Sequence, residues 1–291
     1  MQIIANLAEV SEGYDVLFCD LWGCLHNGKV AFPAAVSALQ RFRASGGKVV
    51  LLTNSPRPSS SVIAQLDLMS VPRDAWDLVV SSGDATQQAM LSGAVGRKVH
   101  HIGAVKDETF FTDFGDELAA YAARQPAIER VSLLDAEGVV CTGLADDLSE
   151  TPDDYRTTLL LAKTRGLTML CANPDVVVDM GETRVYCAGA LAEDFRAMGG
   201  QVLYFGKPHP PIYDLARRRL GLDDPRILCI GDGIMTDVQG GLAEGLDTLF
   251  ITGGLSSGIF GPDKSNPDRA LLQAWLLEIR MTTTFAMGQL A

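Results

Sequence analysis

The chain has 291 residues, 47% of them hydrophobic and 21% charged, so it is long enough for two domains and apolar enough to bury a core in each. Its formal net charge of −12 argues against an extended nucleic-acid partner and against an anionic membrane surface, because both attract positively charged proteins. A small phosphorylated ligand is still allowed, since a metal ion and a lysine can reverse the field inside one cleft.

The first 81 residues predict the start of a parallel sheet. Short apolar runs without alternation, typical of strands buried on both faces, occupy Asp15–Asp20, Lys48–Thr53 and Leu78–Ser81. Between the first two, apolar residues recur at three- and four-residue spacing from Pro33 to Ala44, and two glycines follow as a stop signal, so a helix is expected there. Strand and helix in alternation indicate a doubly wound α/β sheet.

The middle of the chain has elements of its own. Strands are expected at Lys98–Ile102, Ile128–Leu134, Val139–Thr142 and Thr168–Cys171, and helices around Ser82–Ser92, Asp116–Ala123 and Asp153–Thr164. We therefore interpret residues 80–190 as an inserted α/β domain, with hinges near Ser81–Asp84 and Gly189.

After residue 190 the first pattern resumes. Strands are expected at Val202–Phe205, Ile227–Gly231 and Thr248–Thr252, and helices at Pro211–Leu220 and Arg269–Ile279. Residues 1–79 and 191–291 are therefore predicted to form one Rossmann-like core, a doubly wound parallel sheet that carries the inserted domain.

Polar side chains follow several of the predicted core strands, at the edge where open parallel sheets bind ligands. Asp20 leaves the first strand in a Gly-containing turn, where its carboxylate can attack phosphorus or bind a metal. Thr53 and Asn54 end the next strand and can hydrogen-bond a phosphoryl oxygen. Each of these signals is weak when taken alone.

Two later segments add charges of both signs. Lys207 lies between a predicted strand and a proline-containing turn, so its ammonium can neutralise a phosphate or a neighbouring carboxylate. Asp232 and Asp237 lie five positions apart in a Gly-rich turn and offer oxygen ligands that suit octahedral magnesium. The order of the segments and their shared place at strand ends make coincidence improbable.

Together these segments resemble the four motifs of the haloacid dehalogenase (HAD) superfamily, Asp-x-Asp-Gly, Thr/Ser, Lys and Gly-Asp-x-x-x-x-Asp. Thr53–Ser55, Gly206–Pro208, Ala172–Asp175 and the long insertion also resemble subclass IIA, which contains sugar-phosphate, nucleotide and pyridoxal-phosphate phosphatases. The resemblance covers nearly the whole chain. It implies a magnesium-dependent phosphatase with an inserted cap, acting on a small phosphorylated metabolite.

The resemblance also implies a role for each motif residue. Asp20 would be the nucleophile that forms an aspartyl-phosphate, a covalent strategy that divides one displacement into two. Magnesium would be held by Asp20, Asp232 and the backbone carbonyl of Trp22, with Asp237 close by through water. The residues expected to contact the substrate, through its phosphoryl group or its leaving group, are Thr53, Asn54, Ser55, Lys207, Asn173 and Asp175.

The pattern breaks at Trp22. The family's phosphatases carry an aspartate two positions after the nucleophile, as general acid and base, whereas an indole has no useful proton at neutral pH. Positioned acid–base catalysis contributes about 10²–10⁴-fold to a rate. The metal site tolerates this change because position 22 supplies a backbone oxygen to it.

Three interpretations stay open. A substitute acid is available in His26, His209 or Asp175, with His26 the first choice because it lies just past the first motif. Alternatively, the substrate is an acyl or aryl phosphate, whose leaving group needs little protonation. The third interpretation is a catalytically weakened protein that binds a phosphorylated ligand or serves regulation.

Other classes of protein fit less well. No GxGxxG turn follows the first strand, so a dinucleotide-binding oxidoreductase is not expected. The four histidines lack the paired spacing with cysteine that zinc sites show. We expect a cytoplasmic protein, because the six cysteines lack CxxC spacing and the chain shows no secretory leader and no apolar run near 20 residues. The resemblance also implies a possible homodimer, since relatives with such caps are often dimers.

Overall fold

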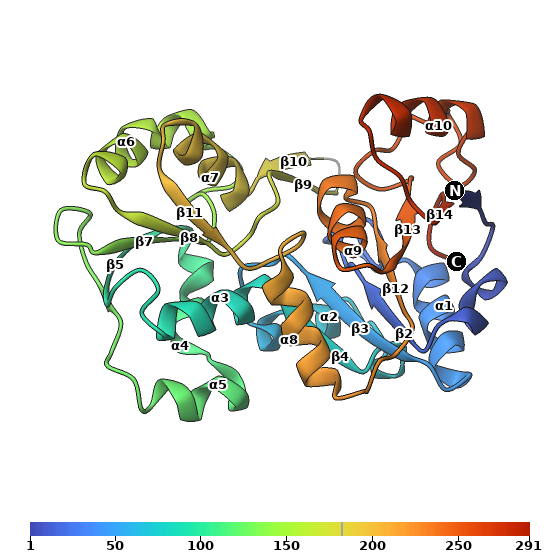
Figure 1. Cartoon of the computed structure of the whole chain (residues 1–291), viewed down its shortest axis with the longest axis horizontal. Helices are drawn as coiled ribbons and strands as arrows, with labels where there is room; N and C mark the ends of the chain where they lie inside the picture. The colour runs from blue at the N-terminus through green and yellow to red at the C-terminus, as the bar shows by residue number, and fades with distance from the viewer. Residues whose placement is uncertain (182) are drawn as a thin grey trace.

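In the computed structural model, which describes residues 1–181 and 183–291, two parallel sheets lie side by side, each flanked by helices (Figure 1). The larger sheet has the order β1-β14-β13-β12-β2-β3-β4. Its strands are β1 (Gln2–Ile3), β2 (Val16–Cys19), β3 (Lys48–Thr53), β4 (Leu78–Ser81), β12 (Ile227–Gly231), β13 (Asp247–Ile251) and β14 (Phe285–Met287). We call this part the core, and it confirms the predicted doubly wound architecture.

The smaller sheet, which we call the cap sheet, has the order β11-β8-β7-β5-β6. Its strands are β5 (Lys98–Ile102), β6 (Glu129–Arg130), β7 (Gly138–Cys141), β8 (Thr168–Cys171) and β11 (Gln201–Tyr204). An antiparallel hairpin, β9 (Val177–Met180) with β10 (Thr183–Tyr186), extends from the cap beside the core (Figure 1). The inserted α/β cap is thereby confirmed as well.

The helices close both faces of each sheet. Those of the core are α1 (Pro33–Ala44), α2 (Ser59–Leu68), α8 (Pro210–Leu220), α9 (Gln239–Ala243) and α10 (Arg269–Glu278). Those of the cap are α3 (Ser82–Leu91), α4 (Thr109–Thr112), α5 (Gly115–Ala122), α6 (Arg156–Thr164) and α7 (Ala188–Ala197). None of the helices in the described ranges combines the length and apolar character that a membrane span requires.

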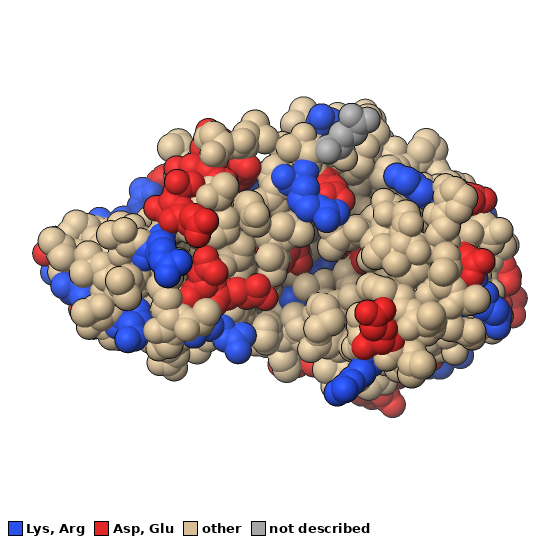
Figure 2. Space-filling view, turned by 90° about the horizontal axis from the view of Figure 1, so that it is seen from above, with Lys and Arg blue, Asp and Glu red and all other residues tan. Residues whose placement is uncertain are grey.

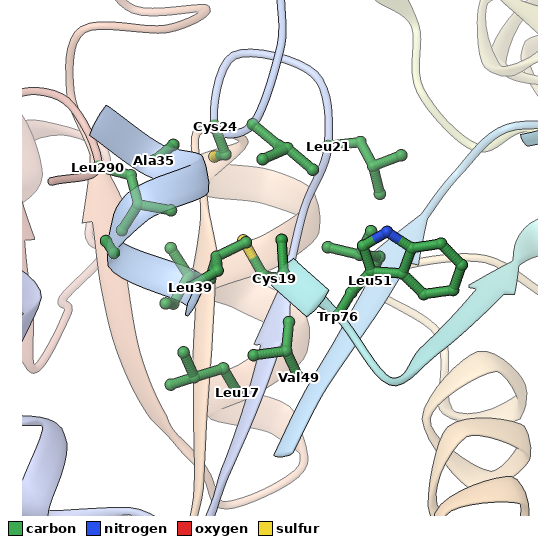
Figure 3. Packing of buried hydrophobic residues seen from close by; sticks show 14 of the residues in the cluster. Leu17, Cys19, Leu21, Cys24, Ala35, Leu39, Val49, Leu51, Trp76 and Leu290 are labelled. Carbon is green, nitrogen blue, oxygen red and sulfur yellow. The ribbon is translucent and has the colours of Figure 1, made fainter. Parts of the chain in front are cut away.

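Strand β2 shows why the predicted runs do not alternate between apolar and polar residues. Its residues Leu17 and Cys19 pack on one face of the sheet with Leu39 of α1 (Figure 3). On the other face Phe18 contacts Tyr213 of α8, with 6.4 Å between the ring centroids. Because helices cover both faces, every position of the strand is buried and apolar.

One predicted strand belongs to the other sheet. The run Val202–Phe205 was expected in the core, but β11 pairs in parallel with β8 of the cap. Buried strands of the core sheet and of the cap sheet have the same apolar composition. An apolar run therefore does not show which of the two sheets it joins. The expected boundary after residue 190 falls inside α7, and we propose instead that the chain returns to the core near Phe205.

Other differences concern short or weakly patterned segments. The predicted strand Ile128–Leu134 is reduced to β6, whose two residues are both exposed at the sheet edge. The helices α2 and α7, the β9–β10 hairpin and the edge strands β1 and β14 were not expected. Short edge strands such as β1 and β14 carry little apolar periodicity, so they are hard to predict from the sequence.

Candidate active site

The predicted motifs converge at the C-terminal edge of the core sheet. Asp20 directly follows β2, Thr53 ends β3 and Asp232 directly follows β12. These three strands are adjacent and parallel, in the order β12-β2-β3, so their ends meet at one place. A cavity of about 530 Å³ opens there between core and cap, and Asp20, Thr53 and Asp232 line it. Figure 2 shows this hollow, with acidic side chains gathered on its cap side.

Lys207 holds two carboxylates at the bottom of the cavity. Its ammonium nitrogen lies 2.6 Å from Oδ1 of Asp20 and 2.6 Å from Oδ1 of Asp237. All three side chains are buried. Burial alone would lower the pKa of Lys207, but Asp20 and Asp237 more than offset it and hold this pKa well above its usual value. The lysine is therefore a fixed positive charge, suited to an incoming phosphoryl group.

Asn54, which was predicted to contact the phosphoryl group, hydrogen-bonds both backbone groups of Lys207. Its Oδ1 accepts a hydrogen bond of 2.7 Å from the backbone N–H of Lys207, and its Nδ2 donates to the Lys207 carbonyl at 3.0 Å. The same Nδ2 donates at 2.8 Å to Asp175 of the cap. Asn54 is absent from the described residues that line the cavity, whereas Thr53 and Ser55 line it.

Asp232 and Asp20 present oxygen atoms to a common point. One oxygen each from Asp20 and Asp232, with the Cys24 sulfur, lie within 4.8 Å of one another. Gly23 makes this approach possible, because a Cβ atom there would lie 1.8 Å from Oδ2 of Asp232. Burial and repulsion from Asp20 and Asp237 raise the pKa of Asp232 well above its usual value.

These donors fit a hard divalent cation. Asp232 has no ion pair in the described part of the chain, because Lys207 pairs with Asp20 and Asp237 instead, so a cation would offset its charge. Burial raises the pKa of the Cys24 thiol, and a soft sulfur suits a hard cation poorly, so the carboxylate oxygens are the fitting donors. Asp237 lies outside the donor group, since its oxygens accept from Lys207 and from the backbone of Gly233.

Trp22 lines the cavity at the position of the missing acid. Its ring meets His26 edge to face, with 5.4 Å between centroids, and Gly28 packs so closely that a Cβ there would lie 2.3 Å from the indole. This packing explains the glycine at position 28, whose φ is +83°.

His26, the first choice for a substitute acid, is buried in the turn after the first motif. The side chain is 1% exposed, and its Nδ1 accepts a hydrogen bond of 3.0 Å from the backbone of Gly28. Burial, assisted by Arg57, lowers the pKa of His26 to about 4. The residue is also absent from the described lining of the cavity, because the turn folds it beneath Trp22.

Of the other two candidate acids, Asp175 lines the cavity and His209 does not. His209 stacks on Tyr204 at 4.8 Å, just before α8, and is absent from the described cavity lining. Asp175 lines the cavity from the cap loop, together with Asn173. Burial raises the pKa of Asp175 to about 6, against the lowering effects of Lys207 and of the Asn54 hydrogen bond.

Further cavity residues were not expected from the sequence. Arg57 also lines the cavity. It lies two positions beyond Ser55, and this nearness to a predicted site residue is the signal by which the sequence could have revealed it. Its guanidinium donates at 2.5 Å to Gln65, and burial lowers its pKa while Asp107 opposes this effect. The cap contributes Lys106, Asp107, Thr142 and Asp147 to the wall, and no local pattern marks them.

Comparisons with known proteins agree with this geometry. A family model described as haloacid dehalogenase-like hydrolase matches residues 17–117, and a HAD-hydrolase-like model matches residues 204–269. A crystal structure of a hydrolase of the haloacid dehalogenase-like family from Brucella suis 1330 is 39% identical. The match covers 98% of this chain and 99% of that one, with a TM-score of 0.83.

Two more distant proteins resemble the chain. The 5′-nucleotidase YutF of Bacillus subtilis is 24% identical over 84% of this chain and 89% of its own length. The glycerol phosphate phosphatase of Mycobacterium tuberculosis, solved in complex with magnesium, is 23% identical, with a TM-score of 0.62. That match covers 84% of this chain and 70% of the other. The latter likeness shows a shared fold.

Proposed function

Because the chain belongs to the haloacid dehalogenase-like hydrolases, subclass IIA, we propose that it is a magnesium-dependent phosphatase that works through an aspartyl-phosphate. Its substrate would be a small phosphorylated metabolite, such as a sugar phosphate or a nucleotide. The observation that carries the proposal is the meeting of Asp20, Asp232 and Lys207, from three distant segments, in one cavity.

The metal would be held by Asp20 and Asp232, with the backbone carbonyl of Trp22 as the third protein ligand and Asp237 reached through water. A bound Mg²⁺ supplies positive charge that neutralises phosphoryl oxygens. The donor chemistry supports this assignment, because the oxygens come from buried or partly buried carboxylates, which suit a hard cation better than the neighbouring sulfur does.

The chain's own residues would perform two displacements. The Lys207 ammonium and the Thr53 hydroxyl orient the phosphoryl group, and a carboxylate oxygen of Asp20 attacks phosphorus. The leaving group departs as the Asp20–phosphorus bond forms. Water then attacks phosphorus and releases phosphate and the Asp20 carboxylate. Lys207 stays within reach of the developing negative charge in both steps.

The size of the cavity supports a small substrate. A volume of about 530 Å³ lies within the range of small-molecule sites, and the cap covers its leaving-group side. We propose a cytoplasmic location, because all six cysteines are buried free thiols. The proposal includes a homodimer, which light scattering of the purified protein would detect.

A screen of phosphorylated metabolites with magnesium tests the proposal. We expect phosphate release from at least one phosphate monoester, and loss of that release when the metal is chelated. Thermal shift should be recorded in the same wells. Stabilisation by a ligand without any release over hours would contradict a phosphatase and favour the weakened binding protein.

A further inference from the structure

The proposed phosphatase lacks the usual acid beside its nucleophile, since Trp22 stands there. We propose that Asp175, from the loop after β8 of the cap, is the general acid and base of the reaction, in place of the missing aspartate. This inference rests on the proposed function and names the residue that protonates the leaving group. It makes the cap loop part of the catalytic machinery.

Asp175 lines the same cavity as the nucleophile. Asp20 follows a core strand and Asp175 follows a cap strand, so the two carboxyl groups reach the same cavity from opposite parts of the molecule. The Nδ2 of Asn54 bridges Oδ1 of Asp175, at 2.8 Å, and the carbonyl of Lys207, at 3.0 Å. The side-chain amide of Asn54 therefore links Asp175 to Lys207, whose ammonium contacts the nucleophile Asp20.

Asp175 also keeps one oxygen free for chemistry. Oδ1 accepts the hydrogen bond from Asn54, whereas Oδ2 has no hydrogen-bond partner in residues 1–181 and 183–291. Because the residue lines the cavity, this second oxygen can carry a proton toward a leaving group.

The backbone of Asp175 is fixed. Its N–H donates at 3.0 Å to the side chain of Asn173, and its carbonyl accepts from Gly189 at 3.1 Å. A Cβ at Gly189 would lie 2.3 Å from the Pro174 carbonyl and 2.4 Å from that of Asp175, so a glycine is required there for α7 to begin against the loop. A catalytic acid needs such support to keep its geometry.

The surrounding charges suit both a proton donor and a proton acceptor. Burial raises the pKa of Asp175 to about 6, while Lys207 and the Asn54 amide lower it and Asp237 raises it. The other groups that feel its charge are Asp20 of the core and two thiols of the cap, Cys171 and Cys187. Both protonation states are therefore accessible near neutral pH.

The remaining carboxyl groups of the cap wall have other partners. Asp147 forms an ion pair with Lys106, and Asp179 forms one with Arg184. Asp107 accepts a hydrogen bond of 2.9 Å from Thr142 and has Lys106 as a charged neighbour. Asp175, by contrast, is bonded to a neutral amide and feels the charges of Lys207 and Asp237.

The proton balance is simple in both steps. As an Asp20 oxygen bonds to phosphorus, the bond from phosphorus to the ester oxygen breaks, and its electron pair takes the Asp175 proton to give an alcohol. In the second step the Asp175 carboxylate removes one proton from water while the water oxygen bonds to phosphorus. The Asp20–phosphorus bond then breaks, its electron pair returns to the carboxylate, and phosphate leaves.

The test compares Asp175→Asn with the wild type on an alkyl phosphate and on 4-nitrophenyl phosphate. The amide keeps an oxygen for the Asn54 hydrogen bond and loses the acid. We expect kcat/KM for the alkyl ester to fall about 10²–10⁴-fold, and for the aryl ester less than about tenfold. Asp153→Asn, which neutralises an exposed aspartate of the cap, is the charge-matched control.

Two further measurements sharpen this test. Trp22→Asp added to Asp175→Asn restores an acid at the usual position, so the alkyl-ester rate should rise again. In the wild type, the ratio of alkyl to aryl kcat/KM should fall as the pH rises above the pKa of Asp175. This ratio needs no variant, so it tests the proposal even if Asp175→Asn does not fold.

Each contrary result has its own meaning. Equal losses for both esters, or no loss, would overturn the acid role, as would a ratio independent of pH. A wild type that hydrolyses neither ester with magnesium would overturn the phosphatase itself. Binding of inorganic phosphate, followed by thermal shift, should be the same in Asp175→Asn and in the wild type, and its loss would assign the residue to phosphate binding.

Discussion

The ammonium nitrogen of Lys207 lies 2.6 Å from a carboxylate oxygen of Asp20, although 187 positions separate the two residues. Asp20 leaves β2 of the core, whereas Lys207 follows β11 of the cap sheet. The contact therefore forms where the chain returns from the cap to the core. Asn54 hydrogen-bonds the backbone N–H and the carbonyl of Lys207, and it also donates to Asp175 of the cap loop. The position of the cap loop is thereby linked, through Lys207, to that of Asp20.

Lys207→Met should destabilise the protein. It would leave Asp20 and Asp237 buried without their common partner, and removal of one partner from a buried ion pair costs about 3–5 kcal/mol. We expect a loss of this size in the free energy of unfolding, measured with urea, together with loss of phosphatase activity. The exposed Lys163 of α6 is the control, and Lys163→Met should behave like the wild type. Equal stability of the two variants would contradict the central role of the Lys207 ion pairs.

Asp20→Asn should abolish turnover, because an amide cannot form the acyl-phosphate. We expect the rate to fall at least about 10³-fold, and acid quenching with a labelled substrate should trap phosphate on the wild type but not on the variant. Asp15→Asn is the comparison, since Asp15 is an exposed residue at the other end of the same strand and pairs with Arg226. Trapped label on Asp20→Asn would require a different nucleophile.

Magnesium should raise the melting temperature of the wild type, because a ligand that binds the folded state stabilises it. Asp232→Asn removes an oxygen donor and should weaken magnesium binding by at least about 10–100-fold, which titration calorimetry measures. Cys24→Ala should retain magnesium binding, because a hard cation prefers the carboxylate oxygens to the neighbouring sulfur. Loss of magnesium binding in Cys24→Ala would show that the sulfur belongs to the site.

Asp175→Asn should change how stability depends on pH. Burial raises the pKa of Asp175 from 3.8 to about 6, so the folded protein binds this proton more tightly than the unfolded chain does. The resulting stabilisation is complete below about pH 4 and is lost as the pH rises through about 6. The variant lacks this dependence, so its stability relative to the wild type should increase across that interval and then level off. Denaturant midpoints of the variant and the wild type, measured between pH 3.5 and 8, check this expectation. A difference in midpoint that does not change with pH would contradict the raised pKa of Asp175.

Much of the core site could be expected from short motifs. Asp20, Thr53 and Asp232 follow strands whose apolar runs are plain in the sequence, and parallel strands bring their C-terminal ends to one edge. The role of Asn54 was harder to anticipate, because its hydrogen bonds go to a backbone segment 153 positions away. A polar side chain after a strand indicates a possible site. The sequence does not show whether its atoms hydrogen-bond a ligand or other residues of the protein.

The proposal of Asp175 as the acid depends on packing. His26 is near Asp20 along the chain, yet the turn buries it beneath Trp22, while Asp175, from a distant loop, lines the cavity. Local patterns of apolar residues, glycines and charges specify strands, helices and the segments that carry chemistry, because these depend on neighbours in the chain. The pairing of β11 with the cap sheet, the residues facing the leaving group and the pKa of Asp175 depend on how the cap lies over the core, and they are properties of the folded molecule.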